Sequence, residues 1–392
     1  MIGLILLLLG GLTLILFAPA AAAQWVGYTA LFVIGLSYGY SRVLRSGLRV
    51  EREPGDLVVY RHQNATVRIR VHNQTTLPVP HLVIADNPGT LYSGNDNARL
   101  ISLKARERIS FSYELRGMNR GSYRIGPITV RYSDPLGMFP VTQTVREEVR
   151  MIVYPSIELV NVTMDRGLPA GTITAASRIY EDPTRYRSVR EYTPGDEIRR
   201  ISWRTTARTG RLHSVEYLPT LSFPVMVVLN LTAADYGRRH RYQHVERTID
   251  AAASLIHRLA ELGQPVGLVS TGTLEADSRL VMPWIPVSSD PGQAASLLGA
   301  LAEIRACETA EPDIVTLFLE QGAVSFGTRV FYLGPPLDPD RVIALATGLG
   351  QRSLLRLHYT DESVVDWRSL AVEAVELYRI TEYGRELFVA QA

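Results

Sequence analysis

Lysine and cysteine are almost absent from this chain of 392 residues, since Lys104 is its only lysine and Cys307 its only cysteine. With the only lysine at position 104, a Gly-x-x-x-x-Gly-Lys phosphate loop is excluded. One cysteine excludes intramolecular disulfides and cysteine-rich zinc sites. A Gly-x-Ser-x-Gly nucleophile elbow is also missing. Cys307 has no histidine near it in the sequence, so we expect a structural thiol rather than a nucleophile.

The chain also lacks an excess of either charge. Its 41 basic residues and 39 acidic residues leave a formal net charge of +2, and 20% of all residues are charged. A nucleic-acid-binding domain would be strongly basic. The composition therefore predicts no nucleic-acid partner.

The first 41 residues contain no charged side chain. Two apolar runs, Ile2–Phe17 and Trp25–Tyr40, approach the about 20 residues that a bilayer-spanning helix needs. We therefore predict two transmembrane helices over residues 1–42, in contact with the lipid bilayer. The basic cluster that follows predicts a cytoplasmic location for the rest of the chain; its members are Arg42, Arg45, Arg49 and Arg52. The alternative is a cleaved signal peptide ending near Ala20–Gln24, but the run lacks the basic start typical of such signals.

The rest of the chain changes its pattern twice. Residues 50–150 contain short runs of alternating apolar and polar residues, such as Val67–Val71, which predict an all-β sandwich. Residues 151–222 are expected to form a connecting segment. Over residues 223–392, apolar strands alternate with amphipathic helices, which predicts an α/β doubly wound parallel sheet. The expected strands are Pro224–Leu231, Val266–Ser270, Arg329–Leu333 and Leu354–His358, and the expected helices include Val245–Leu262, Gln293–Ala302 and Arg341–Leu349.

The connecting segment carries the densest group of distinctive residues. Thr193–Asp196 predicts a tight turn, because Pro194 presets φ and Gly195 accepts a positive φ. Nine arginines and five acidic residues lie between positions 178 and 211. We expect Asp196 to be an internal ion-pair partner and Trp203 a buried anchor. These residues resemble the signature of domain-of-unknown-function family 58, a family of bacterial proteins; the matching positions are Arg190, Tyr192, Gly195, Asp196, Arg199, Ile201, Trp203, Ala207 and Arg208.

A second likeness to this family lies upstream, in Arg120–Pro127 and Asp134–Phe139. We expect the latter to be a turn that closes the sandwich and directs its apolar end to the next unit. The resemblance implies a bacterial inner-membrane protein with a C-terminal domain similar to the von Willebrand factor type A fold. The metal site of that fold has the pattern Asp-x-Ser-x-Ser. Here Asn230, Thr232 and Ala234 stand in its place, so we expect no bound metal and no cofactor.

Two further features bear on chemistry. His240 and His244 are four residues apart, which is the spacing of zinc ligands on a helix, but the arginines around them favour a solvated basic surface. The arginines of the signature fit an anionic ligand as well as internal ion pairs.

The resemblance implies a membrane-anchored interaction or assembly-factor protein without enzyme activity. The resemblance also implies a MoxR-type AAA+ ATPase as the partner, in a chaperone or envelope-related system. The alternative is a hydrolase or an anionic-ligand receptor that uses the arginine-rich signature; a deep pocket around Arg199, Arg204 and Arg208 would favour it.

Overall fold

The computed structural model describes all of the chain except residues 1, 54, 92–96, 161–179, 194–200, 221–223, 277–278, 321–327, 350–353, 361–374, 381–387 and 391–392. It divides into two compact units, Met1–Ser156 and Ile157–Ala392. The first contains two helices and a β-sandwich around one apolar core, and the second contains an α/β domain around another.

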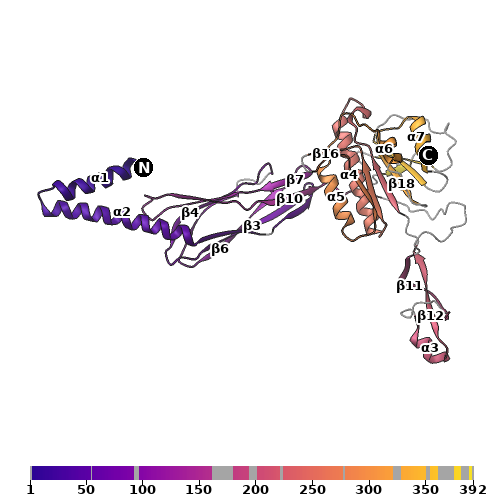
Figure 1. Ribbon diagram of the computed structural model, residues 1–392, viewed down its shortest axis with the longest axis horizontal. Coiled ribbons are helices and arrows are strands. Elements are labelled where there is room, and N and C mark those ends of the chain that lie inside the picture. Colours follow the sequence, from indigo (N-terminus) through magenta and orange to yellow (C-terminus); the bar gives the residue numbers. More distant parts are fainter. Residues whose placement is uncertain are drawn as a thin grey trace. The chain divides into compact units, whose positions relative to one another are not determined.

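The chain begins with two helices, α1 (Ile2–Phe17) and α2 (Ala21–Gly47). Figure 1 shows them side by side as a hairpin. Glycine permits the close approach, because a Cβ atom on Gly27 would lie 2.6 Å from the carbonyl oxygen of Gly11. The remaining surface of both helices is rich in exposed leucine and aromatic side chains, including Leu6, Phe17 and Phe32.

The predicted transmembrane hairpin is wrong, because no helix among the described residues is long and apolar enough to cross a membrane. α1 has 16 residues, and at 1.5 Å per residue a helix of that length falls short of the roughly 30 Å hydrocarbon core. α2 is longer, but its second half belongs to the sandwich, where Leu44 is a core residue. The predicted multi-pass inner-membrane location, and the orientation inferred from Arg42 and its neighbours, depended on those two spans. Both predictions are therefore wrong as well.

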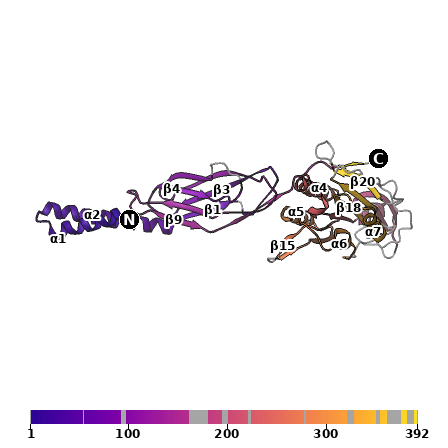
Figure 2. The same ribbon diagram turned by 90° about the horizontal axis from the view of Figure 1, so that it is seen from above.

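Ten strands build the sandwich in the first unit, with β4, β3, β1 and β9 visible in Figure 2. They form three sheets, ordered β1-β3-β6, β2-β10-β7 and β5-β4-β8-β9. In β3 buried side chains alternate with exposed or half-buried ones, because one face of the sheet covers the core and the other meets solvent. The strands are β1 (Leu48–Glu53), β2 (Leu57–Tyr60), β3 (Asn64–Asn73), β4 (Val79–Asp86), β5 (Ala98–Leu103), β6 (Arg108–Arg116), β7 (Gly121–Ile125), β8 (Ile128–Tyr132), β9 (Val141–Val145) and β10 (Val149–Tyr154).

The turn at Asp134–Phe139 joins α2 to the sandwich. The buried carboxylate of Asp134 accepts hydrogen bonds from the backbone N–H groups of Leu136 (3.1 Å) and Phe139 (2.7 Å). The ring of Phe139 meets that of Tyr38 edge to face, and its carbonyl accepts a hydrogen bond from Ser41 Oγ. The expectation that this turn directs its apolar end to the next unit is therefore wrong, because Phe139 packs on the preceding helix.

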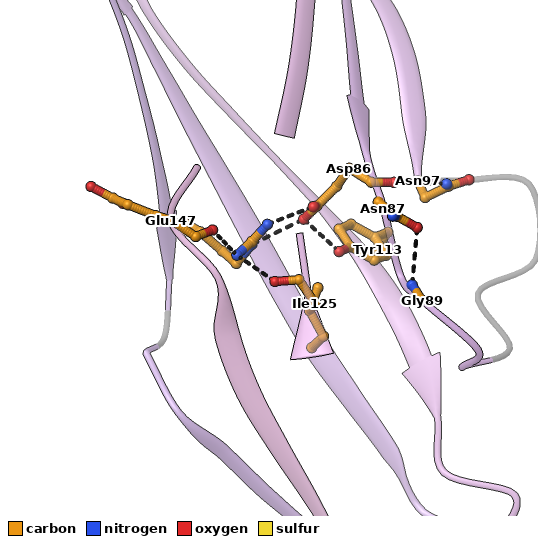
Figure 3. Close-up of polar contacts among 8 residues, drawn as sticks. Asp86, Asn87, Gly89, Asn97, Tyr113, Ile125 and Glu147 are labelled. Carbon is orange, nitrogen blue, oxygen red and sulfur yellow. Dashed lines mark hydrogen bonds and ion pairs between the residues drawn. The ribbon is translucent and has the colours of Figure 1, made fainter. Parts of the chain in front are cut away.

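A buried ion pair connects the three sheets of the sandwich (Figure 3). Arg52 in β1 donates two hydrogen bonds to Asp86 at the end of β4, at 2.5 and 3.0 Å, and both side chains are at most 1% exposed. Tyr113 in β6 donates to the same carboxylate at 2.7 Å. Arg52 also donates to the carbonyl oxygens of Ile125 (3.2 Å) and Glu147 (3.0 Å). This set of bonds satisfies both charges inside the core.

Gly126 lies against this ion pair. Its backbone φ is +123°, a value that residues with a side chain rarely adopt. A Cβ atom there would lie 3.2 Å from Nη2 of Arg52 and 3.0 Å from the carbonyl oxygen of Glu147. The positive φ and this close packing together favour glycine at position 126 of the upstream likeness.

Removing one partner of the buried pair should destabilise the sandwich strongly. Asp86→Ala leaves the Arg52 guanidinium buried without its carboxylate, which typically costs about 3–5 kcal/mol. Glu53→Ala is the control, because the Arg70–Glu53 pair is solvent-exposed and such pairs contribute about 1 kcal/mol or less. Calorimetry of the full chain should show a lower melting temperature for the first variant alone; equal effects of both would contradict this account.

The second unit is built on a seven-stranded sheet with the order β17-β14-β13-β18-β19-β20-β21. The five central strands are parallel and the two edge strands are antiparallel, so the sheet is mixed rather than wholly parallel. Every residue of β13, β14 and β18 is buried. The strands are β13 (Val225–Leu229), β14 (Val266–Ser270), β17 (Trp284–Ser288), β18 (Arg329–Gly334), β19 (Leu354–Tyr359), β20 (Val375–Ile380) and β21 (Phe388–Ala390).

Helices cover both faces of this sheet. Both views show α4 (Arg241–Glu261) and α5 (Gln293–Glu303) on one face, with α6 (Ile314–Glu320) and α7 (Pro339–Leu349) on the other. A small hairpin, β15 (Leu274–Ala276) and β16 (Arg279–Val281), follows β14. The segment that enters the unit is attached to α4, because Glu158 forms a two-bond ion pair with Arg247 and its backbone N–H donates to Ser254 Oγ at 3.0 Å.

Two basic side chains lie inside the sheet domain on β19. Arg356 is 2% exposed and lies over the ring of Phe331, 5.5 Å from its centroid. The imidazole of His358 stacks on the same ring at 5.6 Å. Burial, with a smaller effect from Arg356, lowers the pKa of His358 to about 3. The imidazole is therefore neutral throughout the physiological range.

This neutral histidine predicts a pH dependence of stability. In the unfolded chain a histidine binds its proton near pH 6.5, whereas in the fold His358 does so near 3. Between these values the unfolded state holds more protons, so the free energy of unfolding should fall as pH falls from about 6.5 to 3. His358→Gln should remove part of this slope in denaturant titrations across that window. Identical slopes for His358→Gln and the unaltered chain would contradict the prediction.

Candidate functional site

The strand order places a group of polar residues at the carboxyl edge of the large sheet. β13 lies between β14 and β18, so the chain winds to one side of β13 and then to the other. In such sheets ligands bind at this reversal point, beyond the carboxyl ends of the strands. Asn230 follows β13 directly and Thr271 follows β14, while Tyr332 lies near the end of β18.

Asn230 is the hub of this group and is fully buried. Its Oδ1 accepts hydrogen bonds from the backbone N–H of Thr232 (3.0 Å) and from Thr271 Oγ1 (3.1 Å). Its Nδ2 donates to Oδ2 of Asp235 (2.9 Å) and to the hydroxyl oxygen of Tyr332 (3.4 Å). Two donors and two acceptors exhaust the hydrogen-bonding capacity of a primary amide. The amide therefore serves the protein's own groups.

The residues around Asn230 close the same network. Tyr236 donates to the carbonyl oxygen of Asn230 at 2.6 Å, and burial raises the pKa of this phenol, which keeps it a donor. Thr232 Oγ1 donates to Thr271 Oγ1 at 3.1 Å. The thiol of Cys307 donates to the carbonyl of Thr271 at 3.1 Å, and burial raises its pKa, so the group is a protonated donor rather than a thiolate.

This arrangement leaves few oxygens for a cation. The hydroxyl of Thr232 and the amide of Asn230 are both engaged, and Ala234 is an exposed residue in the short 3-10 helix η2 (Ala233–Asp235). Asp235 keeps an exposed carboxylate at the surface of the cluster. In the part of the chain that the structure describes, no three His, Cys, Asp or Glu residues gather closely enough to hold a metal ion. Hydrogen bonds within the protein occupy the positions where a carboxylate and hydroxyls would bind a hard cation.

The signature lies elsewhere, on a separate hairpin. β11 (Tyr180–Glu191) and β12 (His213–Thr220) pair antiparallel, and α3 (Trp203–Thr209) lies between them in the sequence. Figure 1 shows α3 at the end of this hairpin. α3 ends at Gly210, which has the left-handed φ of 71° that glycine accepts. None of the residues of α3 is buried.

The expectation that Trp203 is a buried anchor is wrong. Its side chain is 65% exposed at the first position of α3. Arg190 and Arg208 are also exposed, while Tyr192 is half-buried. Gly195, Asp196 and Arg199 lie outside the described residues, so the predicted turn and the role of Asp196 stay predictions. Among the described residues, none of the side chains of α3 packs into a core.

The arginines of the hairpin differ in their contacts. Arg190 donates to the backbone oxygen of Glu191 (3.1 Å) and to Thr193 Oγ1 (2.6 Å). Arg211 pairs with the Glu191 carboxylate at 3.1 Å, with both side chains mostly exposed. Arg204 and Arg208 are exposed on α3. The described part of the signature therefore presents its charges to solvent.

The two histidines at zinc-ligand spacing do not share a helical face. His240 precedes α4 with a left-handed φ of 61°, whereas His244 lies inside the helix. The four-residue spacing brings two side chains together only when both are helical.

The comparisons with known proteins agree with the signature. Residues 188–306 match the family described as "Protein of unknown function DUF58". This region of the chain is therefore similar to that family. The uncharacterized protein YeaD of Bacillus subtilis (strain 168) is 26% identical over 212 residues, which are 53% of this chain and 51% of that protein. The chain thus spans about half the length of this relative.

Solved structures give only weak likenesses. The CARDB domain of a Pyrococcus furiosus protein is 21% identical, with a TM-score of 0.21, over 27% of this chain and 91% of that domain. Native alpha-2-macroglobulin of E. coli is 17% identical, with a TM-score of 0.24, over 28% of this chain and 7% of that protein. Scores this low carry no argument about fold or function.

Sequence reasoning found Asn230 and Thr232 but missed the two tyrosines of the cluster. Tyr236 and Tyr332 both reach the Asn230 side chain or backbone with their hydroxyl groups. In the sequence Tyr332 is one apolar-type residue in a buried strand, so its role depends on a pairing that only the fold reveals.

An exchange of charge and amide tests the closed network. Asn230→Asp should place two carboxylates where Asn230 Nδ2 now donates to Asp235, and it should lower the free energy of unfolding by about 1–3 kcal/mol. Adding Asp235→Asn restores a donor and an acceptor across the same gap, so the double variant should recover much of the loss. Chemical denaturation of the three chains measures both effects. Equal stability of Asn230→Asp and the unaltered chain would show that the bond contributes nothing.

Proposed function

We infer that this DUF58-type chain is an interaction or assembly-factor protein and that its signature hairpin contacts the partner. The observation that carries the inference is the 65% exposure of Trp203 on a helix without a buried residue. Tryptophan is the residue that interfaces use most strongly as an anchor. A signature of the family that lies on an exposed hairpin is better suited to contact another molecule than to support a core.

We further propose that the partner is a MoxR-type AAA+ ATPase, in a chaperone or envelope-related system. This step is supported by the resemblance of Arg190, Trp203 and Arg208 to the family signature, since proteins of that family are associated with such ATPases. The match over residues 188–306 supports the family likeness but carries no information about the partner.

The polar cluster at the carboxyl edge of the sheet supports a function without catalysis. A catalytic site needs groups able to exchange protons or bind substrate. The Asn230 amide, however, forms all four of its hydrogen bonds with other groups of the protein. The exposed positions of Arg204 and Arg208 support an open contact surface over the enclosed pocket that a hydrolase or an anionic-ligand receptor would need.

Co-purification tests the proposed partner. The full chain, carrying an affinity tag, is incubated with the MoxR-type ATPase of the same organism, purified separately, with ATP, with ADP or without nucleotide. We expect saturable capture that differs between the ATP and ADP samples, because AAA+ ATPases change conformation with the nucleotide. Capture at the level of a beads-only control in all three samples would refute this choice of partner.

A further inference from the structure

Helix α3 carries one aromatic and two cationic side chains that are exposed in the part of the chain that the structure describes. We call Trp203, Arg204 and Arg208 the signature tip. All three side chains are exposed, and none of the seven residues of α3 is buried. Burial of tryptophan stabilises folds and interfaces because its large ring removes much apolar area from water. In this chain the Trp203 ring remains mostly in contact with water.

The signature tip has a defined shape despite this exposure. The backbone N–H of Ser202 donates to the carbonyl of His213 at 2.9 Å, which ties the start of α3 to β12. At the other end, Gly210 closes the helix with a bond to the carbonyl of Thr206, and the Thr206 hydroxyl accepts from the backbone N–H of His213 at 3.2 Å. A preorganised surface loses little conformational entropy when it binds.

The charge of the tip is positive. Arg204 and Arg208 are four residues apart on α3 and therefore on one face, where two like charges repel each other. Over residues 188–193 and 201–215, four arginines accompany one carboxylate, that of Glu191, and Glu191 pairs with Arg211. A partner that carries carboxylates opposite Arg204 and Arg208 would relieve this repulsion.

We propose that the signature tip docks on an acidic protein surface that contains an apolar pocket. The indole of Trp203 enters the pocket, and Arg204 and Arg208 pair with carboxylates at its rim. The proposal rests on the interaction function proposed above, and it names the chemistry of the partner rather than its identity.

The choice of a protein partner follows from the composition. Arginine and tryptophan side chains can also bind single-stranded nucleic acids. Domains that bind nucleic acids are, however, strongly basic. This chain has a net charge of only +2. Tryptophan and arginine are also the residues that contribute most to protein interfaces, and guanidinium groups form paired hydrogen bonds with carboxylates.

Photocrosslinking identifies what the tip touches. The full chain is expressed in its native host with the photoreactive residue p-benzoylphenylalanine at position 203 and, as a control, at position 25, because Trp25 is equally exposed at 69%. We expect a protein adduct from position 203 that position 25 does not give, joined to a segment with at least two carboxylates. A nucleic-acid adduct, an adduct on a non-acidic segment, or the same adducts from both positions would overturn the proposal.

Affinity measurements with the purified crosslinked protein then test each side chain of the full chain. Trp203→Ala and Arg204→Glu should each raise the dissociation constant at least about tenfold. Trp25→Ala and Arg124→Glu are matched controls at exposed positions and should leave it unchanged. Exposed substitutions usually change stability by about 0.5 kcal/mol or less, so all four variants should keep the melting temperature. Arg204→Glu combined with a carboxylate-to-arginine change in the partner should restore binding, and failure of this rescue would contradict the predicted pairing.

The two proposals fail separately. If the full chain captures the ATPase but the adduct from position 203 lies on no acidic protein surface, the docking chemistry is wrong and the partner stands. If position 203 crosslinks to an acidic protein that is not an ATPase, the docking chemistry stands and the partner is wrong.

Discussion

The sandwich depends on one buried ion pair. Arg52 and Asp86 come from two different sheets, and the remaining donors of the guanidinium group reach carbonyl oxygens at the third sheet and in the loop before β10. A buried charge is stable only when its hydrogen bonds are complete. The pair therefore links the three sheets, and Gly126, which has a positive φ, packs closely against the guanidinium group.

The polar groups of the α/β unit have different environments at the carboxyl edge of its sheet and on the signature hairpin. At the carboxyl edge of its sheet, the Asn230 network binds every donor and acceptor of the amide to protein groups. On the signature hairpin, by contrast, an indole and two guanidinium groups face solvent. Buried polar groups must be satisfied within the fold, whereas exposed apolar and charged groups remain available to another molecule. The Asn230 network is consistent with a structural role, and the signature hairpin is consistent with contact to another molecule.

Strand and helix positions in the second unit were largely predictable from the sequence. The strand predicted at Val266–Ser270 is confirmed to the residue, and the strand predicted at Arg329–Leu333 extends by one residue. Continuous apolar runs between helical patterns carry this information. The parallel strand β20 and the antiparallel edge strands β17 and β21 were missed. The pairing of the two edge strands depends on long-range contacts rather than on local pattern.

The errors share a physical cause. The apolar run around Trp25–Tyr40 predicted a membrane span, but part of α2 packs on the sandwich through Tyr38 and Leu44. Trp203 was expected inside because tryptophan is often buried in cores, whereas it lies exposed on a helix without a buried residue. The Arg52–Asp86 pair was not predicted, since 34 residues separate its members and nothing in the local sequence links them. In each case the burial of the side chain depends on its neighbours in the fold rather than on the residue type.

The central claim is that Trp203 of the free chain faces solvent, and oxidative footprinting read by mass spectrometry measures this directly. Two other tryptophans calibrate the rate, because Trp25 is 69% exposed and Trp284 is half-buried. The account predicts that Trp203 is oxidised about as fast as Trp25 and faster than Trp284. Oxidation of Trp203 at or below the rate of Trp284 would show that the indole is covered within the chain, and it would contradict the account.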